Sequence, residues 1–218
     1  MSGNRKYDDP CGVARALDLI GERWALLVVR ELLLGPKRFT DLRNGLPAAS
    51  QNVLSHRLRE LEQAAVMRRR RLGPPASTWV YELTAWGHDL EPVVLELARW
   101  GSRAQLTSTG ELSVDSLLLA LKTTFDQRAA GELRASYELR LGEDTFCVEI
   151  ADGRIELARG NAESPDVVIE TSPATLRSLV FGNRSLADAK RSDDLSFEGD
   201  WDAAARFVML FPRPAPAA

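Results

Sequence analysis

A helix over residues 50–63 would carry most of its polar side chains on one face. At 100° per residue, Leu54, Leu58, Leu61 and Ala65 fall within about 40° of one another and predict the buried face. The side chains that we expect to contact DNA bases are Ser50, Gln51, Asn52, Ser55, His56 and Arg59. Asn and Gln pair bidentately with adenine, and Arg pairs with guanine. The chemistry that this face could perform is the recognition of base edges in a DNA groove.

Four consecutive arginines follow, from Arg68 to Arg71, and they lead into a Gly-Pro-Pro turn. Alternating segments at 67–72 and 79–83 predict a β-hairpin around that turn. Because strand side chains alternate between faces, Arg68 and Arg70 should point one way and Arg69 and Arg71 the other. Only one pair can face a duplex directly, and the other pair should meet acidic groups or solvent. We expect phosphate contacts, which carry no sequence information, from Lys37, Arg38, Arg57, Arg68, Arg69, Arg70 and Arg71.

Further helices must position these two segments. Apolar spacing predicts helices at 13–20, 22–34 and 39–44, and Thr84 is placed to cap another over 85–100. Ser50 is placed to cap the polar helix. A short helix, a turn, an outward-polar helix and a hairpin together predict a winged helix-turn-helix domain. In that fold the second helix of the pair enters the major groove.

Charge divides the chain of 218 residues into two halves. Residues 1–106 carry 16 Lys and Arg against 12 Asp and Glu, a net charge of +4. Residues 107–218 carry 12 against 19, a net charge of −7. A basic half suits a polyanion that would repel an acidic half, so we predict two domains, 1–106 and 107–218, with the seam in the polar stretch 106–113.

Composition narrows the class of protein. No apolar run approaches the ~20 residues needed to cross a bilayer, and the N-terminus lacks the apolar core of a secretory signal, so we expect a cytoplasmic protein without membrane insertion. Two cysteines and two histidines at distant positions make no recognisable metal site. The usual nucleotide-binding and hydrolase motifs are missing. We therefore expect no cofactor and no enzymatic activity.

The first half resembles the HxlR family of bacterial winged-helix transcriptional regulators. The resemblance covers residues 11–101 and rests on Cys11 followed by LDLIGERW, LLLGPKRFTDL, VLSHRLRELE and YELTAWG. It implies a DNA-binding homodimer with residues 50–63 as recognition helix, 67–83 as wing, and the first helix and 91–100 in the dimer contact. The chain departs from the family at Gly12, where Pro is usual, and at Ala65, where Gly is usual.

Cys11 admits two interpretations. Some regulators of this family sense oxidants or electrophiles through a cysteine at this position, and a sensing thiol needs exposure and a depressed pKa. Arg15, one helical turn away, could stabilise a thiolate. The alternative, which we favour, is a small, partly buried apolar side chain at a dimer interface. Cys147 lies in a strand-like segment and is interpreted as structural.

The second half predicts an α+β domain. An amphipathic helix at 114–125 precedes strands at 135–141, 145–150, 154–158 and 167–171. A helix starting at Ser172 and a final helix at about 200–211 follow. The order of elements from 166 to 211 resembles a sterol-carrier-protein-type domain, and the resemblance covers about residues 112–213.

Such domains enclose an apolar tunnel for long hydrophobic molecules. Carried over by position, the lining residues would be Phe125, Leu176, Leu179, Val180, Phe207, Val208, Leu210 and Phe211. Each of these is equally suited to a packed core, and the sequence does not separate a tunnel from a filled core, since both need apolar lining.

Together these features predict a DNA-binding transcriptional regulator. We expect a homodimer that binds double-stranded DNA and whose operator binding responds to a small hydrophobic ligand in the second domain. The alternative is a lipid-binding carrier protein that uses its winged helix as a protein-interaction module.

Overall fold

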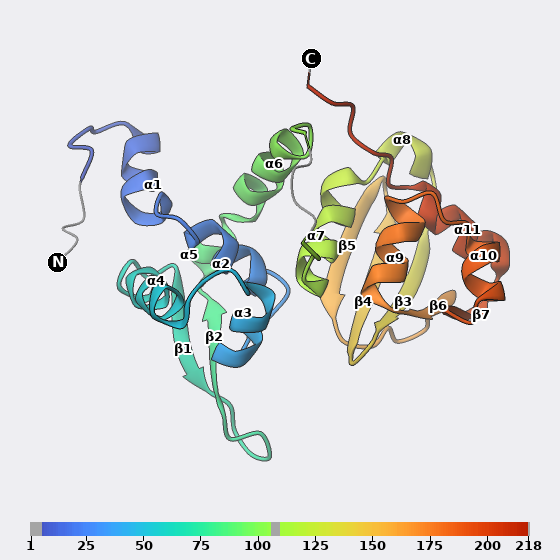
Figure 1. Ribbon diagram of the computed structural model, residues 1–218, viewed down its shortest axis with the longest axis horizontal. Coiled ribbons are helices and arrows are strands. Elements are labelled where there is room, and N and C mark those ends of the chain that lie inside the picture. Colours follow the sequence, from blue (N-terminus) through green and yellow to red (C-terminus); the bar gives the residue numbers. More distant parts are fainter. Residues whose placement is uncertain (1–5, 106–109, 218) are drawn as a thin grey trace. The chain divides into compact units, whose positions relative to one another are not determined.

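The computed structural model describes residues 6–105 and 110–217 and divides into two compact units, Met1–Val94 and Leu95–Ala218 (Figure 1). The predicted seam at 106–113 begins with residues that lie outside those described. The predicted boundary between 106 and 107 therefore stays a prediction.

The first unit is mainly helical, with one two-stranded antiparallel hairpin. Its elements are α1 (Gly12–Ile20), α2 (Ala25–Leu32), α3 (Phe39–Gly45), α4 (Gln51–Gln63), β1 (Met67–Arg71), β2 (Trp79–Leu83) and α5 (Ala85–His88). The unit boundary falls inside the next helix, α6 (Glu91–Gly101). The core gathers one apolar side of each helix, including Leu32 of α2, Leu42 of α3, Leu54 and Leu58 of α4, and Met67 of β1.

Three details differ from the sequence prediction. The predicted helix over 22–34 is shorter, because Trp24 adopts a left-handed conformation with φ 78° and α2 begins after it. The predicted helix over 85–100 is two helices. Pro92 lacks an N–H and its ring would clash with the carbonyl four residues earlier, so the helix restarts at Glu91. Ala65 is exposed, beyond the end of α4, with φ 55°, and does not join the apolar face.

The second unit is a five-stranded sheet with helices. Its elements are α7 (Val114–Thr124), α8 (Gln127–Ala130), β3 (Ala135–Leu141), β4 (Asp144–Ala151), β5 (Arg154–Arg159), β6 (Val167–Thr171), α9 (Pro173–Val180), α10 (Leu186–Arg191), β7 (Leu195–Gly199) and α11 (Trp201–Met209). The strand order is β5-β4-β3-β6-β7, and only the β3–β6 pair is parallel. The α+β prediction is confirmed.

Alternation along the strands separates the two faces of this sheet. Tyr137, Phe146 and Ile169 are buried on the face that the helices cover, where α7 contacts β5 and α11 contacts β6 (Figure 1). Glu149 and Glu170 are exposed on the opposite face. The core of the unit therefore lies between one sheet face and its helices.

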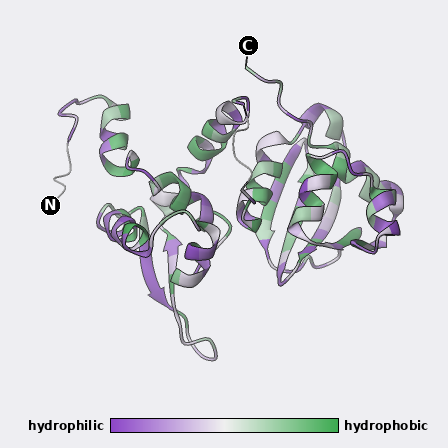
Figure 2. Ribbon diagram, in the orientation of Figure 1, coloured by the Kyte–Doolittle hydropathy of each residue, from purple (hydrophilic) through white to green (hydrophobic). Residues whose placement is uncertain are grey.

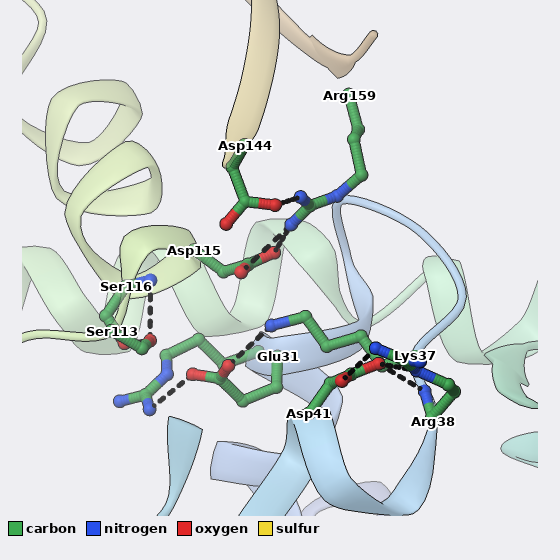
Figure 3. Close-up of polar contacts among 10 residues, drawn as sticks. Glu31, Lys37, Arg38, Asp41, Ser113, Asp115, Ser116, Asp144 and Arg159 are labelled. Atoms are coloured by element: carbon green, nitrogen blue, oxygen red, sulfur yellow. Dashed lines mark hydrogen bonds and ion pairs between the residues drawn. The ribbon is translucent and has the colours of Figure 1, made fainter. Parts of the chain in front are cut away.

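An ion-pair cluster fixes α7 to the edge of the sheet (Figure 3). Arg159 Nη2 donates to both carboxylate oxygens of Asp115, at 3.0 and 3.1 Å, and its other terminal nitrogen binds Asp144. The Asp115 side chain is only 4% exposed. A buried carboxylate is tolerated only when it is paired in this way, so Arg159 is needed wherever Asp115 is present.

Candidate nucleic-acid interface

Helix α4 is held by its apolar face and capped at its first turn. Leu54, Leu58 and Leu61 are at most 2% exposed, as the periodicity predicted. The Ser50 hydroxyl accepts a hydrogen bond from the Val53 N–H at 3.4 Å, which satisfies one of the free amides of the first turn. The helix is thus anchored from one side, and its other side is left for solvent or a partner.

The polar face of α4 is exposed. The predicted base-contacting residues Ser50, Gln51, Asn52, His56 and Arg59 are all exposed, and Ser55 is half-buried. Arg59 Nε donates to the Ser55 carbonyl at 3.2 Å, and His56 Nε2 lies 3.1 Å from Glu60 Oε1. The amide side chains and most of the Arg59 guanidinium donors remain available to a base edge.

The wing separates its four arginines into two pairs (Figure 2 shows β1 as a hydrophilic strand). Arg68 pairs with Glu82 in the strand register, and Arg70 lies on the same face. Both bind Glu82: Arg68 Nε is 2.7 Å from one carboxylate oxygen and Arg70 Nη2 is 2.8 Å from the other. The prediction that one pair meets acidic groups is confirmed. The hydrogen bond from Arg70, followed by that from Arg68, holds the pKa of Glu82 below its usual value.

The second pair lies on the other face of the hairpin. The Arg69 guanidinium carbon is 4.5 Å from the centre of the Trp79 ring, which is a cation–π contact. Arg71 is exposed, and it has no carboxylate partner in the part of the chain that the structure describes. Arg69 and Arg71 are therefore the wing arginines whose charge is not already compensated.

Two of the expected phosphate contacts, Lys37 and Arg57, are buried. Figure 3 shows the first, Lys37, beside Glu31. Lys37 is 9% exposed, and its Nζ lies 2.7 Å from the fully buried Glu31 carboxylate. Its backbone bridges Tyr81 of the wing, so this pair joins α2 to the hairpin. Arg57 is 8% exposed and binds Glu60 and Glu22. Both side chains support the fold, and we leave them out of the interface.

Arg38 is exposed but already bound at the start of α3 (Figure 3). Its Nε and Nη2 each lie 3.0 Å from an Asp41 carboxylate oxygen. Partial burial alone would raise the pKa of Asp41, but the hydrogen bonds and charge of Arg38 outweigh it and lower that pKa. A phosphate contact from Arg38 would have to compete with Asp41.

Sequence reasoning did not find the carboxylates that hold these cations. Glu82 could have been found, because counting outward from the turn places it opposite Arg68 in the hairpin register. Glu31 gave no signal, since a charged residue in an apolar helix is not distinguishable by spacing from one that faces solvent.

Comparisons with known proteins show which family the chain belongs to. The HxlR-like helix-turn-helix family model matches residues 19–109. The HTH-type transcriptional regulator YdeP of Bacillus subtilis is 37% identical over 93 residues, which make up 43% of this chain and 73% of YdeP. The chain belongs to the HxlR-like helix-turn-helix family. It is a transcriptional regulator of the HxlR type, with a winged-helix first half.

Another relative is the HTH-type transcriptional regulator YodB of Bacillus subtilis, 36% identical over 88 residues, or 40% of this chain and 79% of YodB. The solved structure of quinone-bound YodB is 35% identical, with a TM-score of 0.36, over 41% of this chain and 93% of YodB. The second half of this HxlR-type regulator matches the SCP-2 sterol transfer family at residues 116–212. Both predicted resemblances are confirmed.

The predicted ligand-lining residues of the SCP-2 domain lie mostly in its core. Buried among them are Leu176, Leu179, Val180, Phe207, Leu210 and Phe211, while Phe125 and Val208 are half-buried. The rings of Phe207 and Phe211 are 5.1 Å apart, and Phe207 is 4.8 Å from the ring of Tyr137. These rings pack against one another between the last helix and the sheet.

The two cysteines lie in different environments. Cys11 is exposed and precedes α1, and its N–H donates to Asp9 Oδ1 at 2.8 Å. The Cys147 thiol donates to Glu149, and desolvation followed by that carboxylate raises its pKa to about 11. A thiol with so high a pKa is a poor nucleophile. Neither interpretation of Cys11 is tested by these contacts.

The described residues contain neither a candidate metal site nor a membrane-spanning helix. Within 6–105 and 110–217, no group of His, Cys, Asp and Glu could hold a metal ion. No helix in the same ranges is long and apolar enough to cross a membrane.

Proposed function

We propose that this HxlR-type regulator binds a specific operator as a homodimer and that a small hydrophobic ligand in its SCP-2 domain changes that binding. The observation that carries the proposal is the exposed polar face of α4. Asn52, His56 and Arg59 point away from three buried leucines of the same helix. These residue types read base edges, and with Ser50, Gln51 and Ser55 they form the proposed base-reading surface.

Phosphate contacts come from the wing. Arg69 and Arg71 lie on one strand face without a carboxylate on that face, so they are the strongest candidates. Arg68 and Arg70 share one carboxylate and contribute less. The contacts of the wing set the affinity, and those of α4 set the sequence preference.

Exposed apolar side chains support the homodimer. Val13 and Leu17 of α1 are 68% and 41% exposed, one helical turn apart. Val93, Leu97 and Trp100 of α6 follow i, i+4 and i+7 spacing and are 49%, 48% and 76% exposed. Exposed apolar stripes of this kind on helices commonly mark a protein–protein contact such as a homodimer interface. A two-fold dimer would place two copies of α4 in successive major grooves, about 10 bp apart or a multiple of that.

A gel shift with the DNA upstream of the protein's own gene tests the proposal. We expect a shift that strengthens as salt falls, because phosphate contacts release counterions. The absence of a shift even at low salt would refute DNA binding.

A second candidate is a lipid carrier in which the winged helix binds a protein. The match of residues 116–212 to the SCP-2 sterol transfer family favours it. A co-purified lipid in native mass spectrometry, combined with no gel shift at low salt, would support the carrier over the regulator. We continue to expect a cytoplasmic protein without enzymatic activity.

A further inference from the structure

Three arginines from separate segments line one open cleft in the second unit. They are Arg99 in the last turn of α6, Arg128 in α8 and Arg213 in the C-terminal segment. The cleft measures about 410 Å³ and is widely open to solvent. Arg128 and Arg213 belong to residues 107–218, which carry a net charge of −7, so these two positive charges run against the character of that half.

The three guanidinium groups are only weakly compensated. In the part of the chain that the structure describes, the Arg128 side chain has no carboxylate partner, and the residue is exposed. Arg213 Nη2 lies 3.4 Å from Asn183 Oδ1, a neutral acceptor. Arg99 pairs with Glu96, whose side chain is 71% exposed. Exposed ion pairs of this kind contribute little, so an incoming anion can replace Glu96.

The one carboxylate that lines the cleft is already used by the backbone. Asp126 caps α8, and its Oδ1 accepts the N–H groups of Arg128 and Ala129 at 2.8 and 3.2 Å. Its Oδ1 is therefore directed at the first turn of α8. The guanidinium groups remain the dominant charges of the cleft.

The cleft has one apolar side beside the arginines, while its remaining lining is polar: Thr123, Thr124, Asp126 and Gln127. Phe125 forms part of its lining, together with Pro212 and Pro214. The Phe125 ring is half-buried and lies 6.2 Å from the ring of Phe211, which belongs to the core. Because the buried Phe211 ring packs behind Phe125, an apolar group in the cleft would lie against Phe125 and the two prolines.

The wall that carries these prolines is held in place by backbone hydrogen bonds. The Asp126 N–H donates to the Leu210 carbonyl at 2.8 Å, and the Ala217 N–H donates to the Arg103 carbonyl at 2.9 Å. Arg103 Nε also donates to the Ala215 carbonyl at 3.3 Å. The C-terminal segment, which forms one side of the cleft, is therefore held by hydrogen bonds at both of its ends.

We propose that this cleft binds an organic anion with an apolar chain. Its carboxylate or phosphate would be held by Arg99, Arg128 and Arg213, since guanidinium groups match planar oxyanions bidentately. Its chain would lie on Phe125. The inference rests on the proposed function only where it links ligand binding in the cleft to a change in DNA affinity. The link would be α6, which supplies Arg99 to the cleft and Val94 to the core of the first unit.

Isothermal titration calorimetry of the full chain with octanoate tests the site directly. We expect saturable binding that weakens roughly tenfold in Arg128→Gln and in Arg213→Gln, because each loses a charge-assisted hydrogen bond. Arg154→Gln, which removes an exposed arginine of the same unit outside the cleft, should bind octanoate like the parent. Circular dichroism melts check that all three variants fold.

Two further titrants distinguish the contribution of the anionic group of the ligand from that of its apolar chain. 1-Octanol should bind much more weakly than octanoate, and so should inorganic phosphate. Equal binding of 1-octanol would refute the role of the arginines, and equal binding of phosphate would refute the role of Phe125. Octanoate binding that is absent, or unchanged in both arginine variants, would overturn the site.

Operator binding measured with and without octanoate keeps this inference apart from the proposed function. If octanoate binds the cleft and the affinity for the operator does not change, the site stands and ligand modulation through it fails. If no operator DNA is bound at all, the regulator proposal fails while the calorimetric result for the cleft is unaffected.

Discussion

Replacing Glu82 with Gln should strengthen the binding of this protein to DNA at low salt. Glu82 lies within 2.7 Å of Arg68 and 2.8 Å of Arg70, and its side chain is 12% exposed. The substitution keeps the shape of the side chain and removes the charge that occupies both arginines. The pairs are near the surface, where each contributes about 0–1 kcal/mol, so the wing should keep its fold.

The size of the effect follows from counterion release. Arg68 and Arg70 lie on the face of the hairpin opposite Arg69 and Arg71, so once freed they reach phosphates by extending their long side chains past the edge of the hairpin. If both do so, each subunit gains about two phosphate contacts and the slope of log K against log salt steepens by about 1.8. Between about 200 and 50 mM salt this amounts to roughly a tenfold gain in affinity for each subunit. Because phosphate contacts carry no sequence information, specific and random DNA should gain equally.

Fluorescence anisotropy with labelled duplexes across that salt range measures the slope. Glu163→Gln, which removes one exposed negative charge from the second unit, serves as the matched control and should leave the slope unchanged. A Glu82→Gln slope equal to that of the parent would show that Arg68 and Arg70 do not face phosphates even when released.

Three other predictions concern the fold and the assembly. Ala65→Gly should stabilise the first unit by about 1 kcal/mol, because Ala65 has φ 55° and glycine adopts that conformation without strain. A thermal melt measures the gain, and no gain would mean that this turn is unstrained. Phe207→Ala should cost about 3–5 kcal/mol, because the side chain is fully buried between Tyr137 and Phe211; a denaturant titration showing under about 1 kcal/mol would point to an open space instead. Leu97→Glu should give monomers in analytical ultracentrifugation and weaken operator binding, and an unchanged dimer would place the contact elsewhere.

The sequence predicted the elements well where periodicity and breakers agree. The apolar spacing of Leu54, Leu58 and Leu61 and the cap at Ser50 give α4 its bounds almost to the residue. The same reasoning ran two helices together at 85–100, because the apolar pattern continues across Pro92 and the break depends on its missing N–H.

The sequence predicted which side chains of the candidate site are exposed better than it predicted which charged side chains are already paired. Exposure of Asn52, His56 and Arg59 follows from helical geometry alone. Helical geometry does not show which cations are available for phosphate contacts, because Arg57 is held by Glu22, 35 positions earlier in the chain. Spacing along one helix gives no information on partners supplied by another.

The central claim is that Arg59 reads a base while Arg71 binds a phosphate. The direct measurement is the affinity of Arg59→Ala and of Arg71→Ala for operator DNA and for random DNA at one salt concentration. We predict that Arg59→Ala loses about 1–3 kcal/mol on the operator with little change on random DNA, and that Arg71→Ala weakens both equally. Equal weakening of both DNAs by Arg59→Ala would contradict the assignment of α4 as the base-reading surface.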